Sequence, residues 1–122
     1  MFSIEFYKDG SGREPIVEYI RELNNSALTN KDDRIHHKKI IEYLDVLSEY
    51  GVRAGMPYIK HIDGPIWELR PTNDRVFFFY WKNQTYLMLH HYIKKTEKAP
   101  PREIEQAKRN LKDHLERSES NG

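Results

Sequence analysis

A nearly unbroken aromatic run in the middle of the chain constrains the fold more than any other feature. Residues 77–81 are FFFYW, and the run is preceded by Arg75 and Val76. Successive side chains of a strand point to opposite faces of a sheet, so a segment that is apolar at every position predicts a strand covered on both faces. We therefore expect Arg75–Trp81 to be a central strand.

Turn-forming segments on both sides of this strand predict an antiparallel meander. Ile66–Arg70 alternates apolar and charged residues, and Pro71–Asp74 is typical of a hairpin loop. Residues 82–84 turn the chain again before a last strand over Thr85–Lys95. Tyr58–Ile62 is expected to add a short edge strand.

Helical patterns flank the predicted sheet. After an N-terminal strand at residues 2–7, apolar residues at helical spacing predict helices over about 15–25 and 32–50, joined as an α-hairpin. Residues 100–101 are both proline and open a final helix. The fold class is therefore α+β, with an N-terminal strand and α-hairpin packed on an antiparallel meander and a C-terminal helix.

Length and composition favour one cytoplasmic domain. The chain has 122 residues, is 38% hydrophobic and contains no cysteine, which excludes disulfides and thiolate metal sites. No apolar run approaches the ~20 residues of a membrane-spanning helix, and the N-terminus lacks the apolar stretch of an export signal. We expect one domain over residues 1–117 and a flexible tail over 118–122.

Positive charge is concentrated where the sheet is predicted. The whole chain has 20 Lys and Arg against 19 Asp and Glu, but residues 59–98 have 7 against 4, with both tryptophans and three of the six histidines. Lys and Arg bind phosphates and aromatic rings stack on unpaired bases, so this composition is suited to RNA. A solvated sheet face whose charges oppose aggregation is the structural alternative.

Phosphate-loop, dinucleotide-binding, zinc-protease and serine-hydrolase motifs are all absent from the sequence. A zinc site would need histidines, but His90 and His91 are adjacent on a predicted strand and should point to opposite faces. We expect no metal site and no cofactor.

The order of residues in the basic segment resembles a known toxin family. The strings are WELR at 67–70, RVFF at 75–78, LMLHH at 87–91 and KKTEKAPPREI at 94–104. Together they resemble the phage-derived Gp49-like branch of the RelE/HigB toxins, which belong to type II toxin–antitoxin systems. The predicted order of strands and helices matches this family over nearly the whole chain.

The resemblance implies a RelE-like endoribonuclease that cleaves messenger RNA on the ribosome and is silenced by a HigA-like helix-turn-helix antitoxin. It also implies that toxin and antitoxin form a hetero-oligomer and that this complex contacts operator DNA only through the antitoxin. No membrane partner is implied. Metal-independent RNA cleavage uses the neighbouring 2′-hydroxyl as nucleophile, so the enzyme must supply positioning, charge stabilisation and proton transfer.

Candidate catalytic residues lie in the same strings. Arg70 and Arg75 are expected to hold the scissile phosphate and its developing charge. Lys94 and Lys95 resemble the basic pair that closes the family's last strand, and strand alternation lets only one of them face the site. The sequence leaves open which lysine that is. Glu68 is expected to act either as a general base or by orienting Arg70.

The remaining candidates are histidines and lysines. Either His90 or His91 is expected to act as the general acid, because an unperturbed imidazole titrates near pH ~6.5, and His90 is the preferred candidate. His91 stands where the family has glycine and is placed with the RNA contacts, together with Lys60, His61 and Lys98.

Two other functions fit the sequence. ParE toxins share this fold but inhibit DNA gyrase, so the fold does not decide the activity. An inactive copy that works only in the antitoxin complex is the second alternative. The grouping of cations around Glu68 favours the nuclease, because a gyrase inhibitor has no need of convergent phosphate-binding groups.

Overall fold

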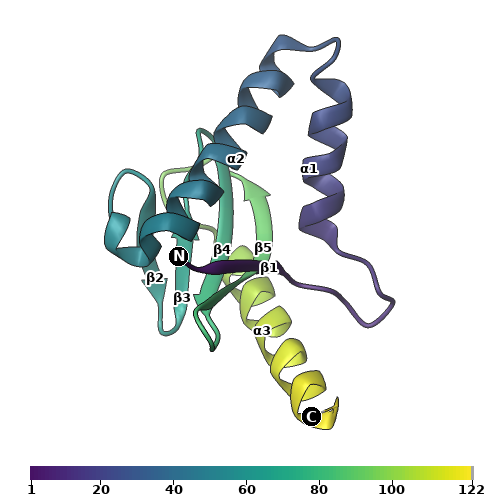
Figure 1. Ribbon diagram of the computed structural model, residues 1–122, viewed down its shortest axis with the longest axis vertical. Coiled ribbons are helices and arrows are strands. Elements are labelled where there is room, and N and C mark those ends of the chain that lie inside the picture. Colours follow the sequence, from purple (N-terminus) through teal and green to yellow (C-terminus); the bar gives the residue numbers. More distant parts are fainter. Residues whose placement is uncertain (122) are drawn as a thin grey trace.

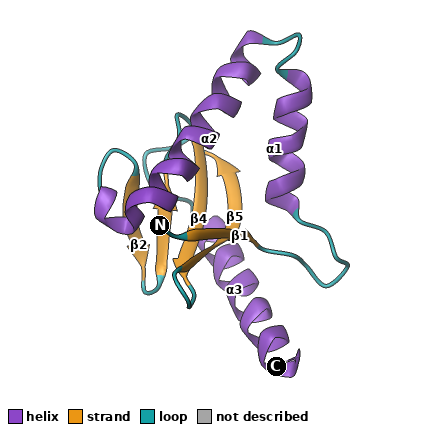
Figure 2. Ribbon diagram, in the orientation of Figure 1, coloured by secondary structure: helices purple, strands orange, loops and turns teal. Residues whose placement is uncertain are grey.

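The computed structural model describes residues 1–121, apart from the side chains of the last two, and shows a five-stranded sheet with helices on both faces (Figures 1 and 2). In chain order the elements are β1 (Ser3–Phe6), α1 (Pro15–Ser26), α2 (Lys31–Tyr50), the 3-10 helix η1 (Gly51–Ala54), β2 (Ile59–Asp63), β3 (Ile66–Leu69), β4 (Asp74–Tyr80), β5 (Thr85–Ile93) and α3 (Pro101–Asn121). The predicted α+β class is confirmed.

The sheet contains the predicted meander and one strand added in parallel. Its spatial order is β1-β5-β4-β3-β2, and each neighbouring pair from β2 to β5 is antiparallel. The predicted edge strand is therefore confirmed as β2. Strand β1 runs parallel to β5, from Ser3 opposite Thr85 to Phe6 opposite Met88. Residues 89–93 of β5 extend beyond the end of β1.

The aromatic run does lie at the centre of the molecule. Phe78 packs on one face of the sheet with Ile16 of α1 and Leu47 of α2. Phe77 and Phe79 pack on the other face, which α3 covers. Each buried phenyl contributes about 1.5–3 kcal/mol of hydrophobic stabilisation, so the run holds both helical layers to one strand.

The ends of the α-hairpin are determined locally. Helix α2 begins after Asn30, whose side chain accepts a hydrogen bond of 3.0 Å from the Asp33 backbone N–H. It ends at Gly51, which has a φ of 65°. A Cβ atom at Gly51 would lie 2.8 Å from both Phe2 and Tyr86, so this helix end requires glycine.

Helix α3 is longer than the sequence predicts. It continues to Asn121, so the tail expected from residue 118 is helical up to that point, and Gly122 lies outside the described residues. The extension is supported by Asp113, which accepts hydrogen bonds from Tyr7 at 2.5 Å and from Arg117 at 2.8 Å. Arg117 also donates to the backbone carbonyl of Lys8. None of the helices in the described part of the chain is long and apolar enough to cross a membrane.

Candidate functional site

Six of the predicted site residues line one small cavity of about 140 Å³ on the α3 face of the sheet. They come from β2, β3, β4 and the segment that leads from β5 to α3. We call this set the basic cluster: Lys60, Glu68, Arg70, Arg75, Lys94 and Lys98. Side chains that are spread over residues 60–98 thus meet at the ends of adjacent strands.

Arg75 is held rigidly in the cavity wall. Its side chain is buried, and its Nη1 donates to the backbone carbonyls of Thr72 at 2.7 Å and Asp74 at 2.9 Å. Burial lowers the pKa of Arg75, and neighbouring Arg70 lowers it further, although Glu68 opposes the shift. A guanidinium stays protonated at working pH, so the hairpin loop fixes a permanent positive charge at this position.

Glu68 lies between the two arginines without a direct hydrogen bond to either. Its Oε1 is 3.8 Å from Arg75 Nε and 3.9 Å from Arg70 Nη1. These distances are too long for hydrogen bonds but short enough for electrostatic attraction. Glu68 therefore attracts both guanidinium groups without forming a hydrogen bond to either, while Nη1 of Arg75 donates to the two loop carbonyls and Nη1 of Arg70 donates to Met56 Sδ at 3.7 Å.

Tyr92 is a cluster neighbour that the sequence analysis missed. Its hydroxyl donates to Glu68 Oε2 at 3.3 Å and its side chain lines the same cavity. Burial raises the pKa of Tyr92 to about 12, and the charge of Glu68 adds to the increase. The phenol is therefore protonated at neutral pH. Tyr92 is two residues before Lys94, so strand alternation places both side chains on one face. This spacing could have predicted Tyr92 as a site residue.

Arg70 and Lys94 are both positioned by hydrogen bonds that continue beyond their strands. The backbone N–H of Arg70 donates to the Tyr58 carbonyl at 3.0 Å, and that of Lys94 donates to the Asn73 carbonyl at 2.8 Å. Lys94 lines the basic cluster, whereas Lys95 lines a neighbouring cavity. The structure therefore places Lys94, not Lys95, with the two arginines.

The match to a family agrees with this geometry. The family model described as "Phage derived protein Gp49-like (DUF891)" matches residues 26–112. The chain belongs to the Gp49-like family. This is a RelE-like toxin family, and the matched range contains every member of the basic cluster. A search of curated proteins finds no match.

The histidines of this Gp49-like chain lie outside the basic cluster. His90 and His91 point to opposite faces, as predicted: His90 Nε2 is 2.9 Å from Glu103 of α3, and His91 Nε2 is 2.8 Å from Asp74. Phe77 pairs with His90 while Phe78 pairs with Met88, so one extra residue bulges from β5 just before His90. The bulge places His90 on the α3 face, which is also the face of the basic cluster, but His90 is paired with Glu103 and does not line the cluster's cavity, where a general acid was expected.

His61 is also separate from the cluster, because it follows Lys60 on β2 and points the other way. Its Nε2 donates to the Gly64 carbonyl at 2.7 Å, and its ring packs edge-on against Trp67. Among the described residues of the Gp49-like chain, no group of three or more His, Asp or Glu side chains could hold a metal ion.

A buried carboxylate lies directly behind Arg75 on the α1–α2 side. Asp74 is fully buried and accepts hydrogen bonds from Tyr19 at 2.6 Å, His91 at 2.8 Å and His36 at 3.2 Å. Burial alone would raise the pKa of Asp74, but these hydrogen bonds outweigh it and the net shift is downward. The network ties α1 and α2 to the strands that carry Arg75 and Lys94.

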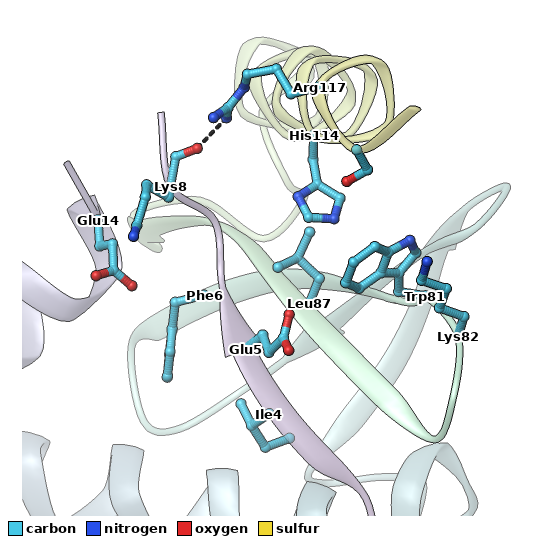
Figure 3. A pocket seen from close by; sticks show the side chains of 11 residues that line it. Ile4, Glu5, Phe6, Lys8, Glu14, Trp81, Lys82, Leu87, His114 and Arg117 are labelled. Atoms are coloured by element: carbon cyan, nitrogen blue, oxygen red, sulfur yellow. Dashed lines mark hydrogen bonds between the residues drawn. The ribbon is translucent and has the colours of Figure 1, made fainter. Parts of the chain in front are cut away.

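A larger cavity of the Gp49-like chain lies elsewhere. It has a volume of about 680 Å³ and lies between β1, the β4–β5 turn and the C-terminal half of α3 (Figure 3). His114 points into it beside Trp81, with a ring separation of 4.5 Å, and its buried Nε2 has no hydrogen-bond partner among the described residues. Burial lowers the pKa of His114. None of the site residues predicted from the sequence lines this cavity.

Proposed function

We propose that this Gp49-like toxin is an endoribonuclease that cleaves messenger RNA through attack by the 2′-hydroxyl on the adjacent phosphate. The observation that carries the proposal is the convergence of five cations on one small cavity, two of them guanidinium groups held by a shared carboxylate. Planar guanidinium groups match the oxygens of a phosphate, and donors fixed before the reaction stabilise charge as it develops.

The cleavage step balances without a side-chain nucleophile. The 2′-hydroxyl gives up its proton to water as its oxygen forms a bond to phosphorus, and the bond from phosphorus to the 5′-oxygen breaks as that oxygen takes up a proton from water. The products are a 2′,3′-cyclic phosphate and a 5′-hydroxyl end. Arg70 and Arg75 neutralise the non-bridging oxygens, which gain charge in the transition state. Lys94 and Lys98 stabilise the departing 5′-oxygen, which takes up a proton as it leaves.

The proposal extends to substrate presentation and to a partner. We place the messenger RNA on the ribosome, where a separate scaffold aligns the chain for in-line attack. An antitoxin of the helix-turn-helix type, with acidic residues opposite the basic segment, would silence the toxin by covering the cluster.

Expression in a bacterial host tests the function directly. We expect growth arrest when the chain is produced alone, rescue when the adjacent small helix-turn-helix protein is co-expressed, and new 5′-hydroxyl ends within coding regions. The double variant Arg70→Ala, Arg75→Ala serves as the inactive control. Growth arrest with altered plasmid supercoiling and no new RNA ends would instead indicate a gyrase inhibitor, and absence of any arrest would indicate an inactive copy.

Glu68→Gln distinguishes an orienting residue from a general base. Loss of a general base lowers the turnover number by roughly 10²–10⁴-fold and removes the acidic limb of the pH profile. We expect a smaller loss and an unchanged acidic limb, because the glutamine oxygen still accepts the Tyr92 hydrogen bond. Tyr92→Phe, which removes only the hydroxyl, is the matched control. Disappearance of the acidic limb in Glu68→Gln alone would assign proton abstraction to Glu68.

A further inference from the structure

A second cavity adjoins the basic cluster across the segment that follows β5. It has a volume of about 470 Å³, and its lining includes Tyr92, which also lines the basic cluster. The connecting segment contributes to both cavities: Lys94 and Lys98 line the cluster, whereas Lys95 lines the second cavity. An RNA strand bound at the basic cluster therefore needs to cross only this segment to enter the second cavity.

Two cations of the second cavity are unpaired within the part of the chain that the structure describes. Lys95 and Arg102 are both exposed, and among the described residues neither side chain forms a hydrogen bond or ion pair. The acidic residue beside them, Glu103, is engaged by His90 at 2.9 Å. Two positive charges thus remain available for an anion.

Aromatic rings form another wall of this cavity. Tyr19 and His91 stack with centroids 3.9 Å apart and an interplanar angle of 25°. Both rings are fixed by the buried Asp74, so a base that packs against them orders no additional side chain. Ile93 lines the same cavity and is 50% exposed, which adds apolar surface that a base would cover.

We propose that this second cavity is an RNA subsite that holds the nucleotide next to the scissile phosphate. Unpaired cations beside fixed rings are the combination that binds single-stranded RNA, since the phosphate needs charge and the base needs a stacking surface. The cavity lies along the part of β5 that β1 does not cover, on the side where α1 lies (Figure 1). The inference rests on the proposed endoribonuclease function and gives Lys95 a binding role distinct from that of Lys94.

Binding of uncleavable RNA tests the subsite separately from catalysis. Oligonucleotides with 2′-O-methyl groups are lengthened one nucleotide at a time on either side of a central phosphate, and their affinity is measured by fluorescence anisotropy at several salt concentrations. We expect extension on one side only to tighten binding to the wild-type chain. In the double variant Lys95→Ala, Arg102→Ala this gain disappears, and the slope of log K against log salt falls by about 1.4, or ~0.7 for each lost phosphate contact.

Two controls separate charge and base contacts. The variant Lys31→Ala, Lys38→Ala removes the same charge from exposed positions of α2, and its extension gain should equal that of the wild type. An abasic residue at the flanking position should lose the ring contact and lower affinity while preserving the salt slope. An unchanged extension gain in Lys95→Ala, Arg102→Ala would overturn the subsite even if RNA cleavage is observed. Failure of the wild-type chain both to bind and to cleave RNA would overturn the proposed function as well.

Discussion

Arg75→Ala is expected to lower the turnover number for RNA cleavage by about 10²–10³-fold, the loss typical for removal of one fixed donor that stabilises transition-state charge. Arg75 is held by two backbone carbonyls of its own hairpin loop, so its guanidinium is in place before substrate binds. Arg75→Lys keeps the charge but loses the planar fork, and its activity should lie between those of the wild type and the alanine variant. Single-turnover cleavage of a short RNA at saturating enzyme measures the effect.

Because Arg75 is buried, its removal must be distinguished from unfolding. Far-ultraviolet circular dichroism of each variant sets a temperature at which it is folded, and cleavage is compared there. Arg21→Ala removes an exposed arginine of α1 and should cleave at the wild-type rate. Wild-type turnover in a folded Arg75→Ala protein would remove Arg75 from the proposed catalytic set.

Local sequence patterns predict the fold well because most of its elements are defined by nearby residues. The FFFYW run, the loop residues around it and the apolar spacing of the helices indicate elements whose bounds agree with the structure to within a few residues. The parallel pairing of β1 with β5 joins residues about 80 positions apart. No local pattern specifies such a pairing, because it depends on how the elements between the two strands pack in three dimensions.

The candidate site was predicted in part, and its differences have specific physical causes. Strand alternation correctly allows only one of Lys94 and Lys95 to face the arginines. Counting along the strand does not identify that lysine, because the bulge before His90 shifts the alternation of side chains in β5. Asp74 has the sequence character of a turn residue, yet it is fully buried at the start of β4. Its partners come from three other elements, and only their tertiary packing reveals the network.

Asp74→Ala is expected to cause the largest loss of stability, about 3–5 kcal/mol, because it leaves buried polar groups without a partner. Tyr19, His91 and His36 all bond to this carboxylate, which has no exposure to solvent. Asp74→Asn keeps the volume and one acceptor oxygen and should lose less. Urea unfolding monitored by tryptophan fluorescence measures both variants, and a loss below about 1 kcal/mol in Asp74→Ala would show that the network contributes little.

The same carboxylate should produce an acid-sensitive component of stability. The pKa of Asp74 in the folded protein lies below its ordinary value of 3.8, so its stabilisation is fully present above that pH and is lost as the pH falls through the folded pKa. The free energy of unfolding of the wild type should therefore decrease more steeply below pH 3.8 than that of Asp74→Asn, which has no carboxylate to protonate. Equal slopes would mean that other carboxylates dominate acid unfolding.

The Asp74→Asn variant should retain RNA cleavage at neutral pH. The reason is that Arg75 is held by the backbone carbonyl of residue 74, which the substitution leaves in place.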